Sequence, residues 1–430
     1  MLKILIKRNR QLIILLALIL TSSMRSELQA QVTLGAEFRP RTEFQHGFNS
    51  PRTTNQEYAL FTTQRTRLNL DVKKDRYSFK MVLQDVRTWG SQSQMVTNDG
   101  ALTTIHESFG VVQLNKSFAV KLGRQEIIYD DHRIFGSVGW AQQARSHDAL
   151  LVQFKNDKTK ADLGFAYNQD RALKKNNFYP VPRSYKTFQN LWINHTFNEN
   201  LNLSILALNL GQQAGIQDSN ASVTYTQTVG GRLGYKNDKF KAFLATYVQT
   251  GENTGMTTVN AINYRADLIY KVHAKHAVAL AYEVLSGNDF FDGSNEQNAF
   301  NPYFGTNHKF NGFMDYFYVG NYNGSAGLSD LVVQYNFTPS DAWNTALYIH
   351  QFAADGEVKK DANSAAMDKN LGTEVDFVVN WIGAKDMKVQ LGYCQLFGTE
   401  TLEFLKGGDT SLTNHFLWVM LTLKPHIFTK

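Results

Sequence analysis

The feature that most constrains the fold is an alternation of apolar and polar residues that recurs along almost the whole chain. In 67–72 (RLNLDV), for example, leucine or valine takes every second position and charged or amide residues take the others. Successive side chains of a strand point to opposite faces, so each such segment has one apolar and one polar face. We expect strands at 32–46, 57–73, 76–89, 104–115, 118–127, 147–156, 159–169, 185–197, 201–211, 222–235, 239–251, 259–272, 276–287, 326–337, 341–353, 370–382, 386–398 and 412–424.

The connections between these 18 segments fall into two length classes that alternate along the chain. After even-numbered segments they are only two or three residues long, as at 74–75, 116–117 and 157–158, whereas after odd-numbered segments they reach the length of 288–325. A soluble β-sandwich or propeller would turn its apolar faces inward and would not sort its loops in this way. An even strand count with short turns at one end is typical of an outer-membrane barrel, which satisfies its backbone in lipid by closing the sheet. The predicted fold is therefore all-β, a transmembrane antiparallel barrel of 18 strands.

Aromatic residues support the same fold, because many of them lie within a few residues of the short turns. Amphipathic rings favour the level of the lipid headgroups, so we expect a girdle at that end of the barrel. Its members are Tyr77, Phe118, Phe154, Phe197, Tyr235, Phe240, Tyr270, Phe337, Trp343 and Trp381.

The first 30 residues are typical of a secretory signal peptide. A basic start precedes an apolar run at 12–20, which is too short to span a bilayer comfortably, and a small residue, Ala30, precedes the expected cleavage site. This segment holds five basic residues and one acidic residue, so only +2 of the formal net charge of +6 remains on 31–430. We expect an exported chain whose residues 31–430 form a single barrel domain in the bacterial outer membrane, and no nucleic-acid partner.

The sequence offers little evidence for an enzyme or for a bound cofactor. The histidines are scattered and no serine lies in a nucleophile elbow, so we expect no enzymatic activity and no cofactor. Asp130, Asp131 and His132 offer a metal site as an alternative, but neighbouring carboxylates point in opposite directions on a strand, which favours a loop network. The single cysteine, Cys394, excludes an internal disulfide and is interpreted as a packing residue.

A barrel of 18 strands is wide enough for an aqueous channel, so its function depends on the residues that line the lumen. A ladder of arginines would attract an anion, because the guanidinium fork suits carboxylate recognition. A lining of mutually neutralised salt bridges, with weak selectivity, is equally compatible with the pattern. Strand parity, with a β-bulge required near 84–87 and 122–126, places these residues inward: Arg39, Arg41, Arg65, Arg67, Asp85, Arg87, Glu107, Arg124, Glu126, Arg232, Arg265, Glu374 and Asp376.

The long connection 288–325 is unlike a solvated loop, since it holds 11 aromatic residues among 38. Long ordered loops often carry function. We expect it to fold into or over the lumen, where it either presents a stacking surface or gate for sugar rings or forms a packed plug. The gate candidates are Tyr303, Phe304, Tyr316 and Tyr318.

Several motifs resemble the alginate export family of outer-membrane proteins. They are LQDVRTWG at 83–90, GRQEIIYDDHRIFG at 123–136 followed by Trp140, Gln143, Arg145 and Asp148, and LGTEVDF at 371–377. LSGNDFFDG at 285–293 and YFGTNHKFNGFMDYFYVGN at 303–321 are similar to the branch found in Bacteroidetes-type bacteria. The resemblance covers essentially the whole chain beyond the signal peptide.

The resemblance implies a monomeric barrel of 18 strands with an arginine-rich constriction that passes an anionic polysaccharide, a polyuronate in the founding member. By motif, Asp85, Arg87, Arg124 and Glu126 would lie on the lumen wall, and Arg133 and Arg145 near the constriction. The implied partners are outer-membrane lipid, the barrel-assembly machinery and an anionic polysaccharide or small polar solute. A general or neutral-sugar porin and a surface-exposed binding barrel are the alternative functions.

Overall fold

The computed structural model describes residues 30–95, 103–172, 174, 177–179, 181–182, 184–215, 221–306, 308–317 and 325–430. The expected signal peptide at 1–30 lies, except for Ala30, outside the described residues. The strands are β1 (Gln31–His46), β2 (Ala59–Lys74), β3 (Tyr77–Thr88), β4 (Thr103–Gln113), β5 (Phe118–Gln125), β6 (His147–Lys155), β7 (Thr159–Tyr167), β8 (Thr187–Thr196), β9 (Leu201–Ala214), β10 (Ser222–Lys236), β11 (Phe240–Glu252), β12 (Thr258–His273), β13 (His276–Leu285), β14 (Glu296–Gln297), β15 (Leu328–Ser340), β16 (Trp343–Ala353), β17 (Asn370–Ala384), β18 (Met387–Gly398), β19 (Asn414–Leu423) and β20 (His426–Thr429), with one helix, α2 (Glu400–Lys406).

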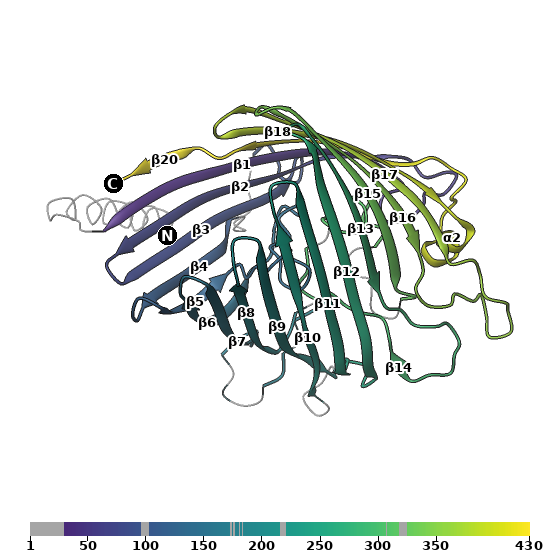
Figure 1. The fold of residues 1–430 in the computed structure, drawn as a ribbon, viewed down its shortest axis with the longest axis horizontal. Helices are drawn as coiled ribbons and strands as arrows, with labels where there is room; N and C mark the ends of the chain where they lie inside the picture. Colours follow the sequence, from purple (N-terminus) through teal and green to yellow (C-terminus); the bar gives the residue numbers. More distant parts are fainter. Residues whose placement is uncertain are drawn as a thin grey trace.

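The strands close into an antiparallel barrel (Figure 1). Each long strand pairs with its neighbours in the chain, and β1 pairs with both β2 and β19, which joins the two ends of the sheet. The two short strands add to this wall, since β14 pairs with β12 and β20 pairs with β1. The 18 long strands confirm the predicted barrel, and their ends lie within three residues of the predicted ends.

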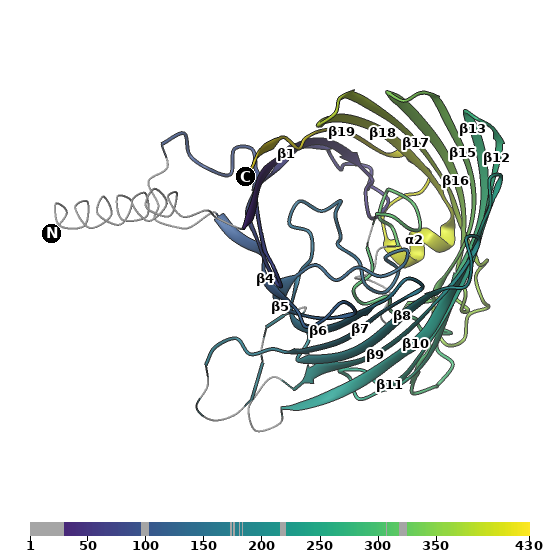
Figure 2. The ribbon, with the colours of Figure 1, turned by 60° about the vertical axis from the view of Figure 1, so that its left-hand side comes forward.

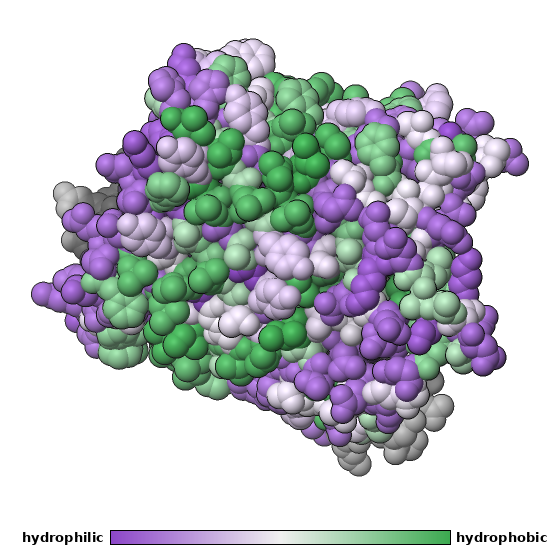
Figure 3. All heavy atoms as spheres, turned by 45° about the vertical axis from the view of Figure 1, so that its right-hand side comes forward, coloured by the Kyte–Doolittle hydropathy of each residue, from purple (hydrophilic) through white to green (hydrophobic). Residues whose placement is uncertain are grey.

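The outer surface of the wall is apolar, as a lipid-facing surface must be. Leu268, Leu280, Val333 and Ile349 are cross-strand partners in one row over four strands, and each is at least 40% exposed. Figure 3 shows the apolar residues as a broad band across the strands, flanked by hydrophilic residues. The burial is the inverse of a soluble protein, in which such side chains fill the core.

The aromatic residues near the short turns include cross-strand pairs. The rings of Phe118 and Phe154 lie 5.0 Å apart, and those of Phe240 and Tyr270 lie 4.8 Å apart. Most of the expected girdle residues have exposed side chains, namely Tyr77, Phe118, Phe197, Tyr235, Phe240, Trp343 and Trp381.

The long-loop end carries the single described helix, α2. Thr399 caps its N-terminus by accepting a hydrogen bond from the amide of Leu402 at 3.4 Å. Among the described residues, no helix combines the length and the apolar character needed to cross a membrane.

The β-bulges predicted near 84–87 and 122–126 are absent from β3 and β5, and a bulge lies on β4 instead. Val82 pairs with Glu107 and Leu83 pairs with Ile105, so His106 is the extra residue. Both His106 and Glu107 are buried as a result. Strand β3 therefore keeps its regular alternation, which decides where its charged residues point.

Candidate functional site

Two connections fold inward and fill part of the barrel: 126–146, between β5 and β6, and 298–306 with 308–317, between β14 and β15. Figure 2 shows loops inside the ring of strands. The two inner segments bind each other, since the amide of Gly136 donates to the carbonyl of Phe304 at 2.9 Å and that of Thr306 donates to the carbonyl of His132 at 3.0 Å. We call the part of the lumen that they fill the constriction.

Arginines of β1 anchor the first inner segment. Arg39 Nη1 donates to the carbonyl of Gly139, and Arg41 Nη1 donates to the carbonyl of Trp140, each at 2.6 Å. The Arg41 guanidinium also lies 3.8 Å from the centre of the Trp140 ring and forms an ion pair with Glu43 at 2.7 Å. The backbone carbonyl groups of a buried loop need hydrogen-bond donors, and the arginines of β1 supply them here.

Arg65 of β2 has the same role. Its Nη2 lies 2.5 Å from Glu37 Oε1, and its Nη1 donates to the carbonyl of Gln142 at 3.4 Å. All three of these arginines are buried. These three arginines of the predicted ladder therefore face inward, and their guanidinium groups are bound by carboxylates of β1 and by the loop.

On the far wall, Glu283 of β13 binds two predicted arginines. Arg133 of the first inner segment donates from Nε to Glu283 Oε1 at 2.7 Å and from Nη2 to Oε2, and Arg265 Nη1 lies 3.2 Å from Oε2. Arg265 also pairs with Asp267 at 2.7 Å. Glu283 is fully buried, so the paired guanidinium groups compensate its desolvation.

Arg232 and Arg145 complete the arginine contacts of the inner segments. Arg232 Nε lies 3.3 Å from Asp131, and Arg145 Nη1 donates to the carbonyl of Gly305 at 3.1 Å. Burial lowers the pKa of Arg145 to about 10, so this guanidinium stays charged at neutral pH.

Glu374 and Asp376 of β17 hold the second inner segment by its backbone. The amide of Met314 donates to Glu374 Oε1 at 2.8 Å, and the amide of Phe313 donates to Asp376 Oδ2 at 3.3 Å. Gly312 has a φ of +83°, and a Cβ at this position would lie 2.5 Å from Glu374 Oε1. Only glycine therefore allows the backbone to approach the carboxylate this closely.

The expected aromatic gate is mostly packed. Phe304 lies within a buried cluster with Phe135 and Phe188, and Tyr316 is fully buried with its hydroxyl donating to the carbonyl of Gly47 at 2.7 Å. Tyr303 is partly buried, and this burial raises its pKa. Tyr318 lies outside the described residues. The geometry of the described rings is that of the packed-plug alternative.

Three predicted lumen residues lie on the outer face of the wall. Asp85 and Arg87 pair with Thr66 and Gln64 in the β2–β3 ladder, so they share the face opposite to Arg65. Their prediction placed the bulge on β3, and the alternation of β3 is in fact regular.

Arg124 is the third of these residues. It pairs with Asp148 at 2.9 Å, on the same face as the exposed Leu122. Strand β5 ends at Gln125, and the change of direction there brings Glu126 into the lumen, where its Oε1 lies 3.9 Å from Arg67 and 2.7 Å from His106.

A cavity of about 670 Å³ borders the constriction. Its lining contains the cationic side chains of Arg39, Arg265, Lys309 and Lys388 and one carboxylate, Asp267. The two lysines were not predicted from the sequence, although Lys388 shares the parity of the inward Cys394 and Lys309 lies in the aromatic-rich connection. The cavity lining of the described residues is thus net positive.

Comparison with known proteins identifies the family. A family model described as alginate export matches residues 30–411. The chain belongs to the alginate export family. No curated protein matches the chain.

Solved outer-membrane porins share the fold of this alginate export family member at low sequence identity. Pseudomonas aeruginosa OpdL is 11% identical with a TM-score of 0.62, over 92% of this chain and 99% of that one. Acinetobacter baumannii OccAB4 is 11% identical with a TM-score of 0.61, over 93% and 100%. Pseudomonas aeruginosa OccK11 is 9% identical with a TM-score of 0.58, over 93% and 96%. Family and fold together indicate an outer-membrane channel for solutes.

Proposed function

We propose that this barrel selects anionic or polar solutes, and that an anionic polysaccharide of the alginate type is its substrate. The observation that carries the proposal is the cavity lining, with four cationic side chains and one carboxylate. Cationic groups in a narrow, partly desolvated passage attract anions, and several weak sites allow a polyanion to leave again.

Lys309 and Lys388 are the cations most able to meet a solute. Lys309 has an exposed side chain, donates to the carbonyl of Asp131 at 2.6 Å and forms no ion pair among the described residues. Lys388 is partly exposed on β18. Arg39 lines the same cavity and is held by neutral acceptors of the first inner segment, so it contributes a fixed positive potential, whereas Arg265 is paired with Asp267 and Glu283.

A general or neutral-sugar porin is the second candidate. It is favoured by the pairing of Arg41, Arg65 and Arg133 with carboxylates, which reduces the field of the arginine ladder. The two candidates differ in ion selectivity, so one electrical measurement separates them.

The test is the reversal potential of the refolded barrel in a planar bilayer under a salt gradient, with and without an oligouronate. The proposed function requires anion selectivity and blockade by the oligouronate. Cation selectivity, or no ion selectivity, without blockade by the oligouronate would instead support the general or neutral-sugar porin.

Replacing Lys309 and Lys388 by glutamine should abolish most of the anion selectivity, because these substitutions remove the two cavity lysines, neither of which forms an ion pair among the described residues. The reversal potential of the double variant reports the loss. Lys360→Gln is the matched control, since Lys360 pairs with Glu400 on the surface at 2.8 Å and lies outside this cavity. Equal reversal potentials in the double variant and the wild type would contradict the role of the lysines.

Anion selectivity should also fall as the pH rises, and it should do so below the ordinary lysine pKa of 10.5. Partial desolvation inside the barrel, together with the nearby Arg232 and Arg265, outweighs the opposing charge of Asp131 and holds the pKa of Lys309 below that value. The side chain is charged below its pKa and neutral above it, so the loss occurs on the alkaline side. Reversal potentials measured from neutral to alkaline pH should change less in Lys309→Gln than in the wild type.

We also propose that residues 1–30 are removed on export, that the remaining chain forms one domain, and that the barrel-assembly machinery inserts it as a monomer. The apolar outer band supports contact with outer-membrane lipid around the wall. Mass determination of the purified barrel in detergent tests both the cleavage and the oligomeric state.

A further inference from the structure

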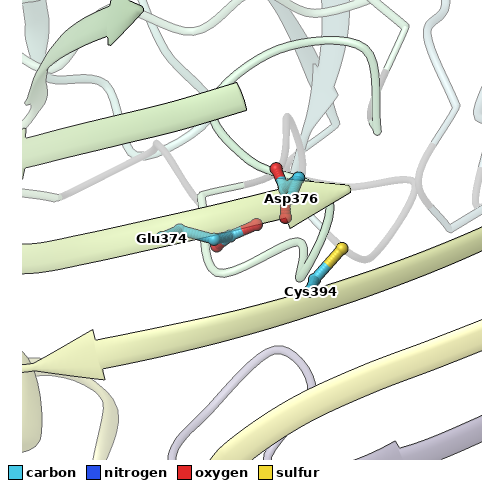
Figure 4. Close-up of side chains that lie close together, drawn as sticks. All are labelled: Glu374, Asp376 and Cys394. Carbon is cyan, nitrogen blue, oxygen red and sulfur yellow. The ribbon is translucent and has the colours of Figure 1, made fainter. Parts of the chain in front are cut away.

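Glu374, Asp376 and Cys394 form a cluster in the lumen wall that differs from the other buried acidic groups. Glu374 and Asp376 lie two residues apart on β17, and Cys394 is the register partner of Asp376 on β18. One ligand atom from each of the three lies within 4.8 Å of the other two, and all three residues are fully buried. Figure 4 shows the two carboxylates and the thiol gathered in one place.

The charge of this cluster lacks the compensation found elsewhere in the lumen. Four other buried carboxylates have a lysine or arginine partner: Glu37 has Arg65, Glu43 has Arg41, Glu107 has Lys80 and Glu283 has Arg133. Among the described residues, no lysine or arginine forms an ion pair with Glu374 or Asp376. Two adjacent buried carboxylates without a cation are costly, so the site favours a positive ligand.

In each of the two carboxylates, one oxygen accepts a backbone amide and the other does not. Glu374 Oε1 and Asp376 Oδ2 accept the amides of Met314 and Phe313. Glu374 Oε2 and Asp376 Oδ1 are buried and accept no hydrogen bond from a backbone amide or a basic side chain of the described residues, so the two carboxyl groups and the Cys394 thiol have only one another as polar neighbours there. Buried oxygens are nearly always satisfied, so these two atoms point to a ligand.

His350 of β16 supplies a fourth group beside the cluster. Its Nδ1 lies 3.0 Å from both oxygens of Asp330, which as a carboxylate can only accept, so Nδ1 carries the proton. The lone pair of the neutral ring is then on Nε2, which lies 3.8 Å from Asp376 Oδ2. A histidine oriented by a carboxylate through its other nitrogen is the usual arrangement of a metal ligand.

We propose that Glu374, Asp376 and Cys394 bind a divalent transition-metal cation of the Zn²⁺ class, with His350 beside it. A thiolate, an imidazole and carboxylates together favour Zn²⁺ over Ca²⁺ or Mg²⁺, which prefer oxygen ligands alone. Binding releases the thiol proton to solvent. His350, Gly312 and Phe313 also line the cavity of about 670 Å³, which gives the ion a route from the lumen.

The metal would fasten the second inner segment to the wall. The carboxylates that bind it also hold the amides of 313 and 314, so the ion fixes the orientation of the groups on which that segment rests. This role is independent of the solute that the channel passes, and the site can be tested without any transport measurement.

The experiment titrates the refolded full-length barrel in detergent with Co²⁺, which reports thiolate ligation by a charge-transfer absorption band. We expect one equivalent to bind, the band to appear, and Zn²⁺ but not Ca²⁺ to displace the Co²⁺. Cys394→Ser should abolish the band, and Glu374→Gln should weaken Co²⁺ binding by at least about 10-fold. The matched control is Asp148→Asn, an exposed acid on the outer face, which should leave both unchanged.

The wild type alone already decides the proposal, so it stays testable if a variant does not fold. Co²⁺ binding far below one equivalent, or binding without the charge-transfer band, overturns it and leaves a proton shared by the two carboxyl groups as the compensating charge. Undiminished binding in folded Glu374→Gln and Cys394→Ser barrels overturns it as well. Heat-modifiable migration on a gel shows which barrels are folded.

Discussion

Replacing residues 303–317 by a short Gly–Ser linker should raise the single-channel conductance several-fold. This segment binds the first inner segment through Gly136 and Thr306 and borders the cavity of about 670 Å³ with Lys309 and Phe310. Its removal widens the narrowest part of a lumen that an 18-stranded wall would otherwise leave open. Planar bilayer recordings give the conductance directly.

The matched control for this deletion is replacement of 362–366, in a connection at the same end of the barrel whose residues do not line the cavity. That variant should conduct like the wild type. If the barrel without 303–317 is folded and its conductance is unchanged, the constriction lies elsewhere and the inner segment only stabilises the wall.

Glu283→Gln should give the largest loss of stability among single substitutions in the lumen, about 3–5 kcal/mol in the free energy of unfolding. The substitution removes the charge that Arg133 and Arg265 share inside the barrel, where both guanidinium groups are largely shielded from water. Asn263 and Asn311 also donate to this carboxylate, so a neutral amide disturbs four contacts at once. Urea unfolding of the barrel in phospholipid vesicles measures the difference.

An ion pair on the outer face provides the comparison. Asp148→Asn breaks the pair with Arg124, whose partners are 43% and 62% exposed, and should cost about 0–1 kcal/mol. Equal losses in the free energy of unfolding for the two variants would mean that water reaches the Glu283 cluster in the folded barrel. Burial would then not strengthen its ion pairs.

The strands could be predicted because the signal is local. A period of two residues is visible within any ten positions, and each pair of strands is joined by the turn that follows in the chain. The face of the sheet toward which a charged side chain points is harder to predict, because one extra residue in a strand reverses it. His106 is such a residue on β4, and the bulge was assigned to β3 instead, so Asp85 and Arg87 were placed on the wrong face.

The constriction itself could be predicted only in outline. The aromatic density of 288–325 indicated a segment that packs, but the contacts that position it join distant residues, such as Arg133 with Glu283 and Met314 with Glu374. The periodicity of the sequence contains no information about such pairs of distant residues. Lys309 and Lys388 were missed for a related reason, because a lysine acquires its role in the lumen only from the cavity that other segments form around it.

Trp140 touches both strands that meet where the barrel closes. Its ring lies under Arg41 of β1 and has its centre 5.2 Å from that of Trp418 on β19. The inner segment therefore spans the seam from inside, and the two strands cannot part without breaking these contacts. Because the β1–β19 ladder closes the sheet, the wall has no lateral opening at this seam, and a solute in the lumen enters and leaves at the ends of the barrel.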